Sequence, residues 1–158
     1  MPRKVTKSLQ RRINPDRKYN SVLVQKLINK SMLDGKKHVA EVAVYSALET
    51  AAKKLKSENP LEIFEKAFEN ISPNFEVKSR RVGGANYQIP FPISGHRREH
   101  FAMMWLVQSA RDKKGMPYEQ RLSLEIVDAY NGAGTAFKKK EDTHRMAEAN
   151  RAFAHFAR

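Results

Sequence analysis

The sequence predicts a mainly α-helical, single-domain bundle of about six helices, with a protruding β-hairpin between the third and fourth helices and a basic N-terminal arm. Through most of residues 19–158, apolar residues recur at three- and four-residue spacing, as in amphipathic helices. Residues 75–91 instead alternate at period two around Gly83-Gly84, as in the strands and tight turn of a hairpin. Residues 1–18 are strongly basic, so we expect an arm that orders on a polyanion; the alternative is a disordered tail that only aids solubility.

The first two helices are predicted from their apolar stripes and their ends. Ser21 can cap a first helix that runs to Leu33 and stops at Asp34-Gly35, where glycine accepts a left-handed backbone. The second helix is expected over residues 37–55. Its predicted apolar stripe is Val39, Val42, Tyr45, Leu48, Ala52 and Leu55.

The third and fourth helices have the clearest signals. Asn59 can cap the third helix, Pro60 suits its first position, and Pro73 ends it. The fourth helix, residues 97–113, is apolar all round in its middle. We therefore expect it at the centre of the bundle, with Trp105 in the core.

Two more helices complete the predicted bundle. Pro117 opens the fifth, and the glycines of residues 131–134 break the chain after it. The last helix is expected from about Asp142. The side chains predicted to face its core are Met146, Ala149, Phe153 and Phe156.

The charge of the chain favours an anionic partner. It has 30 Lys and Arg against 17 Asp and Glu, a net charge of +13, which attracts nucleic acid or an anionic membrane. The longest apolar run, residues 101–107, is too short to span a bilayer, so no membrane partner is predicted. There is no cysteine, phosphate-loop spacing or nucleophile elbow. We therefore predict no enzyme activity, no cofactor and no small-molecule substrate.

Basic clusters are spread along the chain, which suits a large folded RNA better than one major-groove site. The predicted RNA-binding cations are Arg3, Lys4, Arg11, Arg12, Lys36, Lys37, Lys78, Arg80, Arg81, Arg97, Arg98, Lys138, Lys139 and Lys140. Because an isolated two-stranded hairpin is marginal in water, we expect a bound polyanion to hold it. The alternatives are a surface hairpin with merely solvated charges, and a sequence-specific DNA or mRNA regulator that reads with its helices.

A stripe of polar residues on the last predicted helix raises another alternative, a metal-dependent hydrolase. His144, Glu148, Arg151 and His155 follow at spacings of four, three and four. A zinc-protease helix needs two histidines four apart with a glutamate next to the first, and the local cations repel a metal ion. We therefore predict no metal and interpret the stripe as solvated or RNA-facing.

Several long motifs resemble one family. They are residues 76–84 with 87–90, and 138–150 with 152–155, supported by 34–37 and 45–50. Over nearly its whole length the chain resembles the bacterial small-subunit ribosomal protein seven family (the universal uS7 family). The resemblance implies a helical bundle with a protruding hairpin that binds the 3′ major domain of small-subunit rRNA and starts assembly of the head. It places such a protein in the cytoplasm, with an organellar ribosome as the alternative.

The resemblance also implies partners and roles. The partners are exit-site tRNA, departing mRNA, and the neighbouring ribosomal proteins nine and eleven. The residues implied to face tRNA and mRNA are Gly83, Gly84, Ala85, Arg145 and Arg151. The sequence departs from the family at Ser94 and Met104, where arginine is common, and at its C-terminal end, where a terminal aromatic often follows the last arginine.

Overall fold

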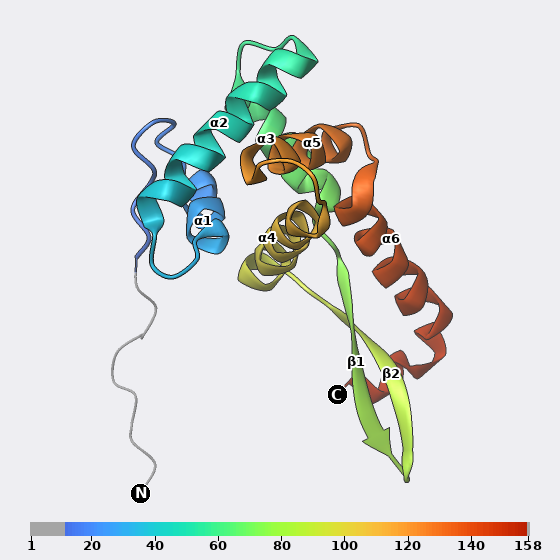
Figure 1. Ribbon diagram of the computed structural model, residues 1–158. Coiled ribbons are helices and arrows are strands. Elements are labelled where there is room, and N and C mark those ends of the chain that lie inside the picture. Colours follow the sequence, from blue (N-terminus) through green and yellow to red (C-terminus); the bar gives the residue numbers. More distant parts are fainter. Residues whose placement is uncertain (1–11, 158) are drawn as a thin grey trace, which may run out of the picture.

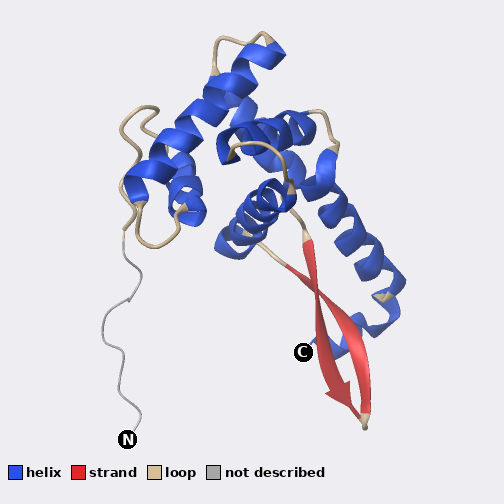
Figure 2. Ribbon diagram, in the orientation of Figure 1, coloured by secondary structure: helices blue, strands red, loops and turns tan. Residues whose placement is uncertain are grey.

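The computed structural model describes residues 12–157 and is a helical bundle from which one hairpin projects (Figure 1). Figure 2 shows that the hairpin is the only sheet in this described part of the chain. The mainly α prediction, with a hairpin between the third and fourth helices, is confirmed. In chain order the elements are α1 (Val22–Ser31), α2 (Lys37–Leu55), α3 (Pro60–Ile71), β1 (Phe75–Val82), β2 (Ala85–Pro92), α4 (Gly95–Asp112), α5 (Tyr118–Tyr130), α6 (Gly134–Ala149) and the 3₁₀ helix η1 (Arg151–Ala157).

The core lies where α4 and α5 cross the other helices. Leu106 of α4 and both Leu122 and Ile126 of α5 are fully buried, and α5 contacts α2, α3, α4 and α6. Trp105 is 9% exposed, and its ring centroid lies 5.5 Å from that of Phe101. The prediction that α4 is central and that Trp105 belongs to the core is confirmed.

The first two helices differ in detail from the prediction. α1 ends at Ser31 rather than Leu33, which is 61% exposed. The predicted stripe of α2 was wrong at Val39 and Val42, which are 65% and 52% exposed. The helix instead buries a face rich in alanine: Ala40, Val44, Ala47, Leu48, Ala51 and Ala52. Small side chains let neighbouring helices approach closely, and a search for large apolar residues overlooks them.

α3 begins as predicted. Asn59 Oδ1 accepts the Leu61 N–H at 3.1 Å, and Asn59 Nδ2 donates to Glu62 Oε1 at 2.8 Å. This is a helix cap that satisfies an otherwise orphan backbone donor. α4 begins at Gly95, two residues earlier than expected, so Arg97 lies inside its first turn.

The last helix was predicted wrongly at both ends. α6 begins at Gly134, not near Asp142, so Lys138, Lys139 and Lys140 lie within it. It ends at Ala149, and the chain continues as η1. Met146, predicted to face the core, is 51% exposed.

The early start of α6 depends on Gly134, which has a φ of +90°. A Cβ added there would lie 2.8 Å from Asp128 Cβ, closer than real side chains approach. Glycine therefore permits a short turn from α5 into α6. Buried Glu125 then accepts the Ala136 N–H at 2.7 Å and satisfies a donor in the first turn of α6.

The hairpin pairs Phe75 with Pro92 and Val82 with Ala85, which leaves Gly83 and Gly84 as a two-residue turn. Their φ values are +57° and +90°, and positive φ at both positions is what a type I′ turn requires. The hairpin predicted over residues 75–91 is thus confirmed. No helix within residues 12–157 is both long and apolar enough to cross a bilayer.

Candidate nucleic-acid interface

The hairpin divides its cations between two faces. Lys78 and Arg80 lie on the face that carries Phe91, since directly paired side chains share a face. Lys78 Nζ is 5.0 Å and Arg80 Cζ 5.8 Å from the centroid of the Phe91 ring. Arg81 pairs with Asn86 on the opposite face and is exposed. A polyanion can therefore meet cations on either side of the hairpin.

A buried carboxylate lies at the base of this hairpin. Glu76 accepts Lys78 Nζ at 2.7 Å on one oxygen, and Arg97 Nε at 2.9 Å on the other. Burial opposes ionisation of this carboxyl, but the hydrogen bonds from Lys78 and Arg97 outweigh it and hold the pKa of Glu76 below its ordinary value. Two of the predicted RNA-binding cations are thus already engaged by a protein anion.

The C-terminal segment packs against the hairpin. The ring of Tyr87 lies 5.0 Å from that of Phe153 and 5.8 Å from that of Phe156, centroid to centroid. Arg80 Nη1 donates to the Phe156 carbonyl at 3.2 Å. In Figure 1 the chain after α6 turns back beside the strands. Protein contacts therefore support the hairpin, and a polyanion bound to it stays a prediction.

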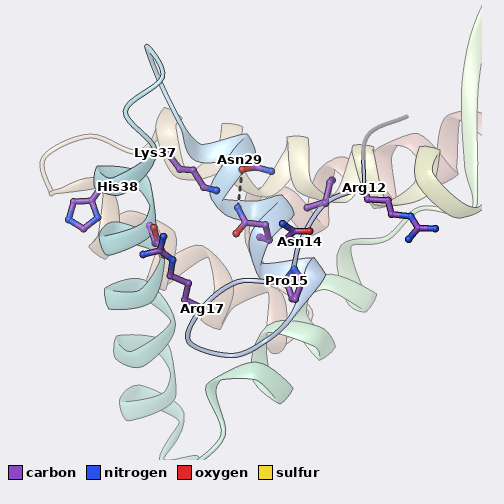
Figure 3. A pocket seen from close by; sticks show the side chains of 10 residues that line it. Arg12, Asn14, Pro15, Arg17, Asn29, Lys37 and His38 are labelled. Atoms are coloured by element: carbon purple, nitrogen blue, oxygen red, sulfur yellow. Dashed lines mark hydrogen bonds between the residues drawn. The ribbon is translucent and has the colours of Figure 1, made fainter. Parts of the chain in front are cut away.

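The start of α2 borders a basic hollow of about 710 Å³ (Figure 3). Arg12, Arg17, Lys37 and His38 all line it. Figure 3 shows the Lys37 side chain pointing across the hollow towards α1. Lys36, the N-cap residue, is exposed and makes no side-chain cap bond. An anion bound in this hollow would gain from both the cations and the helix N-terminus.

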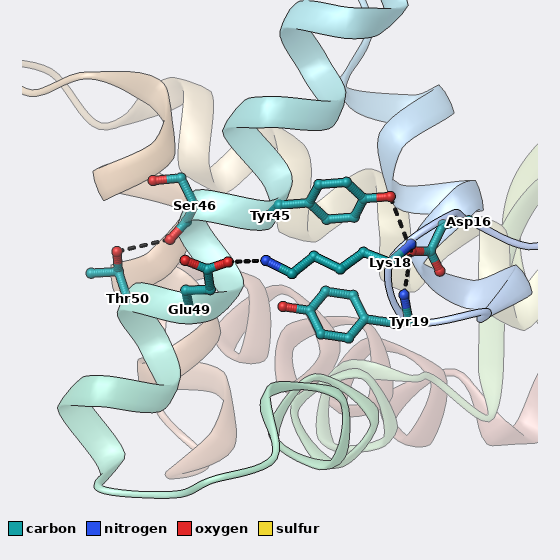
Figure 4. Close-up of polar contacts among 7 residues, drawn as sticks. All are labelled: Asp16, Lys18, Tyr19, Tyr45, Ser46, Glu49 and Thr50. Carbon is teal, nitrogen blue, oxygen red and sulfur yellow. Dashed lines mark hydrogen bonds and ion pairs between the residues drawn. The ribbon is translucent and has the colours of Figure 1, made fainter.

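The chain that leads into this hollow is anchored to the bundle (Figure 4). Asp16 is 3% exposed and accepts the N–H groups of Lys18, Tyr19 and Ser21 at 2.8 to 3.0 Å. It also accepts the Tyr45 hydroxyl at 3.0 Å. Asp16 and Lys18, which the sequence assigned to the arm of residues 1–18, therefore contact the body. Arg3, Lys4 and Arg11 lie outside the described residues.

The electrostatics of this anchor agree with its geometry. Burial opposes ionisation of Asp16, but the backbone N–H groups and Tyr45 outweigh it and lower the pKa of that carboxyl. Burial and Asp16 together raise the pKa of Tyr45 to about 12. The Lys18 side chain lies between the rings of Tyr19 and Tyr45, and its Nζ is 5.6 and 5.7 Å from their centroids (Figure 4). The same Nζ forms an ion pair with Glu49.

The lysines of α6 do not form one basic patch. Lys138 is exposed, Lys139 pairs with Asp112 at 3.7 Å, and Lys140 Nζ donates to the Asn70 carbonyl at 2.7 Å. Burial, together with the charge of Arg98, lowers the pKa of Lys140. Only part of this predicted cluster is therefore directed to solvent.

The residues predicted to face tRNA and mRNA occupy separate elements. The tip, residues 83–85, is exposed. Arg145 is an exposed residue of α6 that pairs with Asp142, and Arg151 opens η1. Arg151 also lines a hollow of about 520 Å³ between the hairpin and α6, whose apolar wall includes Phe75.

The predicted polar stripe does not lie on one helix. His144 and Glu148 belong to α6, which ends at Ala149, whereas Arg151 and His155 belong to η1. His144 Nε2 accepts the Asn74 N–H at 3.0 Å, and the ring packs on Phe75. Burial, with the charge of Lys140, lowers the pKa of His144. Among residues 12–157, no group of three or more His, Cys, Asp or Glu side chains could hold a metal.

The two departures from the family pattern have plain positions. Ser94 is the exposed N-cap residue of α4 and makes no side-chain cap bond. Met104 is partly buried and packs on the core.

Sequence reasoning missed Glu76 and Asp16, whose roles depend on distant partners such as Arg97 and Tyr45. The period-two pattern that places Glu76 beside Lys78 was the one available signal.

Comparison with known proteins shows one family. The family model described as "Ribosomal protein S7p/S5e" matches residues 2–151. The chain is 58% identical over 149 residues to the small ribosomal subunit protein uS7 of Chloroflexus aggregans, which covers 94% of each chain. It is 55% identical over 147 residues to the uS7 protein of Thermotoga neapolitana, covering 93% of this chain and 94% of that protein.

Proposed function

Because this chain belongs to the ribosomal protein S7p/S5e family, we propose that it is a structural, non-enzymatic constituent of the small ribosomal subunit that binds its rRNA. The observation that carries the proposal is the family match over residues 2–151. Relatives that align with at least 93% of this chain bear the name of a small-subunit protein. The net charge of +13 supports an rRNA partner, because phosphate contacts dominate affinity for nucleic acids.

The finer proposal is that the protein binds the 3′ major domain of small-subunit rRNA and starts assembly of the head, in the cytoplasm. Exposed cations support it, since they remain available to phosphates. Among the described residues these include Arg12, Lys36, Lys37, Arg81 and Lys138. They lie in three separate parts of the molecule: around the hollow at the start of α2, which Arg12 also lines, on the hairpin and on α6. This distribution suits an irregular folded RNA.

We further propose that the hairpin tip and the α6–η1 region face the exit tRNA and the path of departing mRNA, beside ribosomal proteins nine and eleven. The exposed tip carries no bulky side chain at Gly83 and Gly84, so a nucleic-acid backbone can approach it closely. Arg145 and Arg151 supply exposed cations on the neighbouring elements.

Filter binding to the 3′ major domain of small-subunit rRNA tests the rRNA proposal. We expect saturable binding that resists competition by duplex DNA and by unrelated structured RNA. If roughly six to ten phosphates are contacted, affinity should fall about 10³- to 10⁵-fold between ~50 and ~200 mM salt. Equal competition by either nucleic acid would contradict specific recognition, and a flat salt response would contradict a phosphate-based mechanism.

The hairpin role has its own test. Arg81→Ala should weaken rRNA binding and lower the salt slope by about 0.9, the value for one lost phosphate contact. Arg80→Ala should also weaken binding, but it removes the bond to the Phe156 carbonyl as well and so also loosens the hairpin. Lys54→Ala, at the exposed C-terminal end of α2, is the matched control. Wild-type affinity in the Arg80→Ala/Arg81→Ala double variant would rule out the hairpin contact.

A further inference from the structure

One acidic side chain lies within the proposed RNA-binding surface. Glu76 is 6% exposed and carries a cation on each carboxylate oxygen. Its Oε1 lies 2.7 Å from Lys78 Nζ. Its Oε2 lies 2.9 Å from Arg97 Nε and 2.8 Å from Arg97 Nη2. The carboxylate therefore joins β1 to the first turn of α4, and so joins the hairpin to the bundle.

Each of these cations also contacts an aromatic ring. Lys78 Nζ lies 5.0 Å from the centroid of Phe91, and Arg97 Cζ lies 4.5 Å from that of Phe101. Cations at such distances are attracted to the ring face. The Lys78 and Arg97 side chains are nevertheless 51% and 53% exposed. The two heads are fixed in place and still open to a ligand.

We propose that Glu76 is a positioning residue of the RNA site, which holds Lys78 and Arg97 as a preformed pair for phosphates of folded RNA. The proposal rests on the proposed rRNA-binding function. A lysine and an arginine that are already ordered lose less conformational freedom when they bind a ligand. The Arg97 guanidinium keeps further N–H donors beyond those used by Glu76, and Lys78 keeps two of its three. Each head can therefore bind the carboxylate and a phosphate together.

For removal of the Glu76 charge, the positioning role and net charge alone predict opposite changes in rRNA affinity. A carboxylate beside a phosphate-binding surface repels RNA, so its removal should tighten binding if only net charge matters. A positioning role predicts the reverse, because Lys78 and Arg97 become free to move and the hairpin loses a link to α4. The lowered pKa of Glu76 supports an ionised carboxylate at neutral pH.

The decisive experiment measures rRNA affinity of Glu76→Gln by filter binding at fixed salt. We expect affinity about 3- to 10-fold weaker than wild type, within the range for directly coupled groups. The matched control is Glu65→Gln, which removes one negative charge from the exposed surface of α3. It should bind as tightly as wild type or slightly more tightly. Unchanged or tighter binding by Glu76→Gln would overturn the proposal.

A second background separates positioning from a general structural role. In the Lys78→Met/Arg97→Met protein, the further change Glu76→Gln should leave rRNA affinity unchanged or slightly tighter, since the cations that it positions are gone and only the charge effect remains. An equal loss of affinity in both backgrounds would show that Glu76 does not act through these cations. Thermal unfolding of each variant verifies that the bundle is folded.

A third variant keeps the proposal testable if Glu76→Gln fails to fold. Arg97→Lys retains the charge but replaces two nitrogens on Oε2 by one, and it should also bind rRNA more weakly. Wild-type affinity in Arg97→Lys would overturn the positioning role. If the wild-type protein itself shows no preference for rRNA, the proposed function fails and this inference fails with it. Tighter binding by Glu76→Gln to a specific rRNA refutes only the inference.

Discussion

Two buried glutamates in this molecule have different surroundings. Glu125 is fully buried in α5; it accepts the Ala136 N–H at 2.7 Å and pairs with Lys113 Nζ at 2.8 Å. Glu76 is nearly as buried, but both of its cationic partners are half exposed. The first carboxylate joins helix to helix inside the bundle, and the second joins the hairpin to the bundle at its surface.

The difference shows that burial of an acid does not by itself reveal its role. The partners of Glu125 are more buried: Ala136 is fully buried and the Lys113 side chain is 26% exposed. Removing Glu125 leaves a buried donor unsatisfied and should mainly lower stability. The partners of Glu76 point outward, so removing it should be felt mainly in what they bind.

The largest effect is expected for Glu125→Ala. It should lower the free energy of unfolding by about 3 to 4 kcal/mol, because it breaks a buried pair and orphans the Ala136 N–H. Urea unfolding measures the loss, with Glu119→Ala on the same helix as the control. Glu76→Ala should cost less stability than Glu125→Ala. The contrast fails if the two variants are equally destabilised.

The turn beside Glu125 gives a second test. Gly134→Ala should cost about 2 to 3 kcal/mol, since it combines a positive φ with a Cβ that would lie 2.8 Å from Asp128 Cβ. Gly132→Ala is the matched control: its φ is also positive, but the nearest side-chain atom to an added Cβ, Phe137 Cζ, would be 3.9 Å away. It should cost about 1 kcal/mol. If urea unfolding shows the same loss of free energy of unfolding for both variants, the close approach at Gly134 does not contribute to stability.

A third buried carboxylate sharpens the comparison, since most partners of Asp16 are backbone N–H groups. Asp16→Asn should cost about 1 to 2 kcal/mol at pH 7. The pKa of Asp16 is lowered in the folded protein, so its stabilisation is present above the ordinary value of 3.8 and is lost as the pH falls through the lower, folded value. The difference between wild type and variant should therefore shrink in acid. A difference that is constant with pH would contradict an ionised Asp16.

The smallest effect on global stability is expected at the hairpin. Tyr87→Ala removes the contacts with Phe153 and Phe156 and should cost about 1 kcal/mol. Amide hydrogen exchange in β2 should accelerate more than exchange in α5. Tyr87→Phe keeps the ring and is the control, with exchange close to wild type. Unchanged exchange in Tyr87→Ala would mean that the aromatic contacts with η1 do not stabilise the hairpin.

The hairpin and most helices could be predicted because their signals are local. Asn59 and Pro60 mark a helix start within two residues, and Gly83-Gly84 marks a turn within two. The start of α6 could not, because residues 131–134 contain two glycines and look like a long break. Only the contact of Gly134 with α5 shows how short the turn is.

The candidate site could be predicted only as a set of cations. Charge is visible in a sequence, but the direction of a side chain is not, so Lys140 was grouped with Lys138 although it points to the Asn70 carbonyl. Phe153 and Phe156 were assigned to a core stripe because their spacing is also helical. They contact Tyr87 instead, since α6 ends at Ala149.

The packing of η1 on the hairpin also has a consequence for the order of synthesis. The chain is made from its N-terminus, and domains fold as they emerge. The hairpin, residues 75–92, is translated well before Phe153 and Phe156, and α4, α5 and α6 come in between. A nascent chain therefore carries a hairpin without its aromatic support until translation passes Phe156. Until then the contacts of Glu76 with Arg97, and of His144 with Asn74 and Phe75, are what join the hairpin to the bundle.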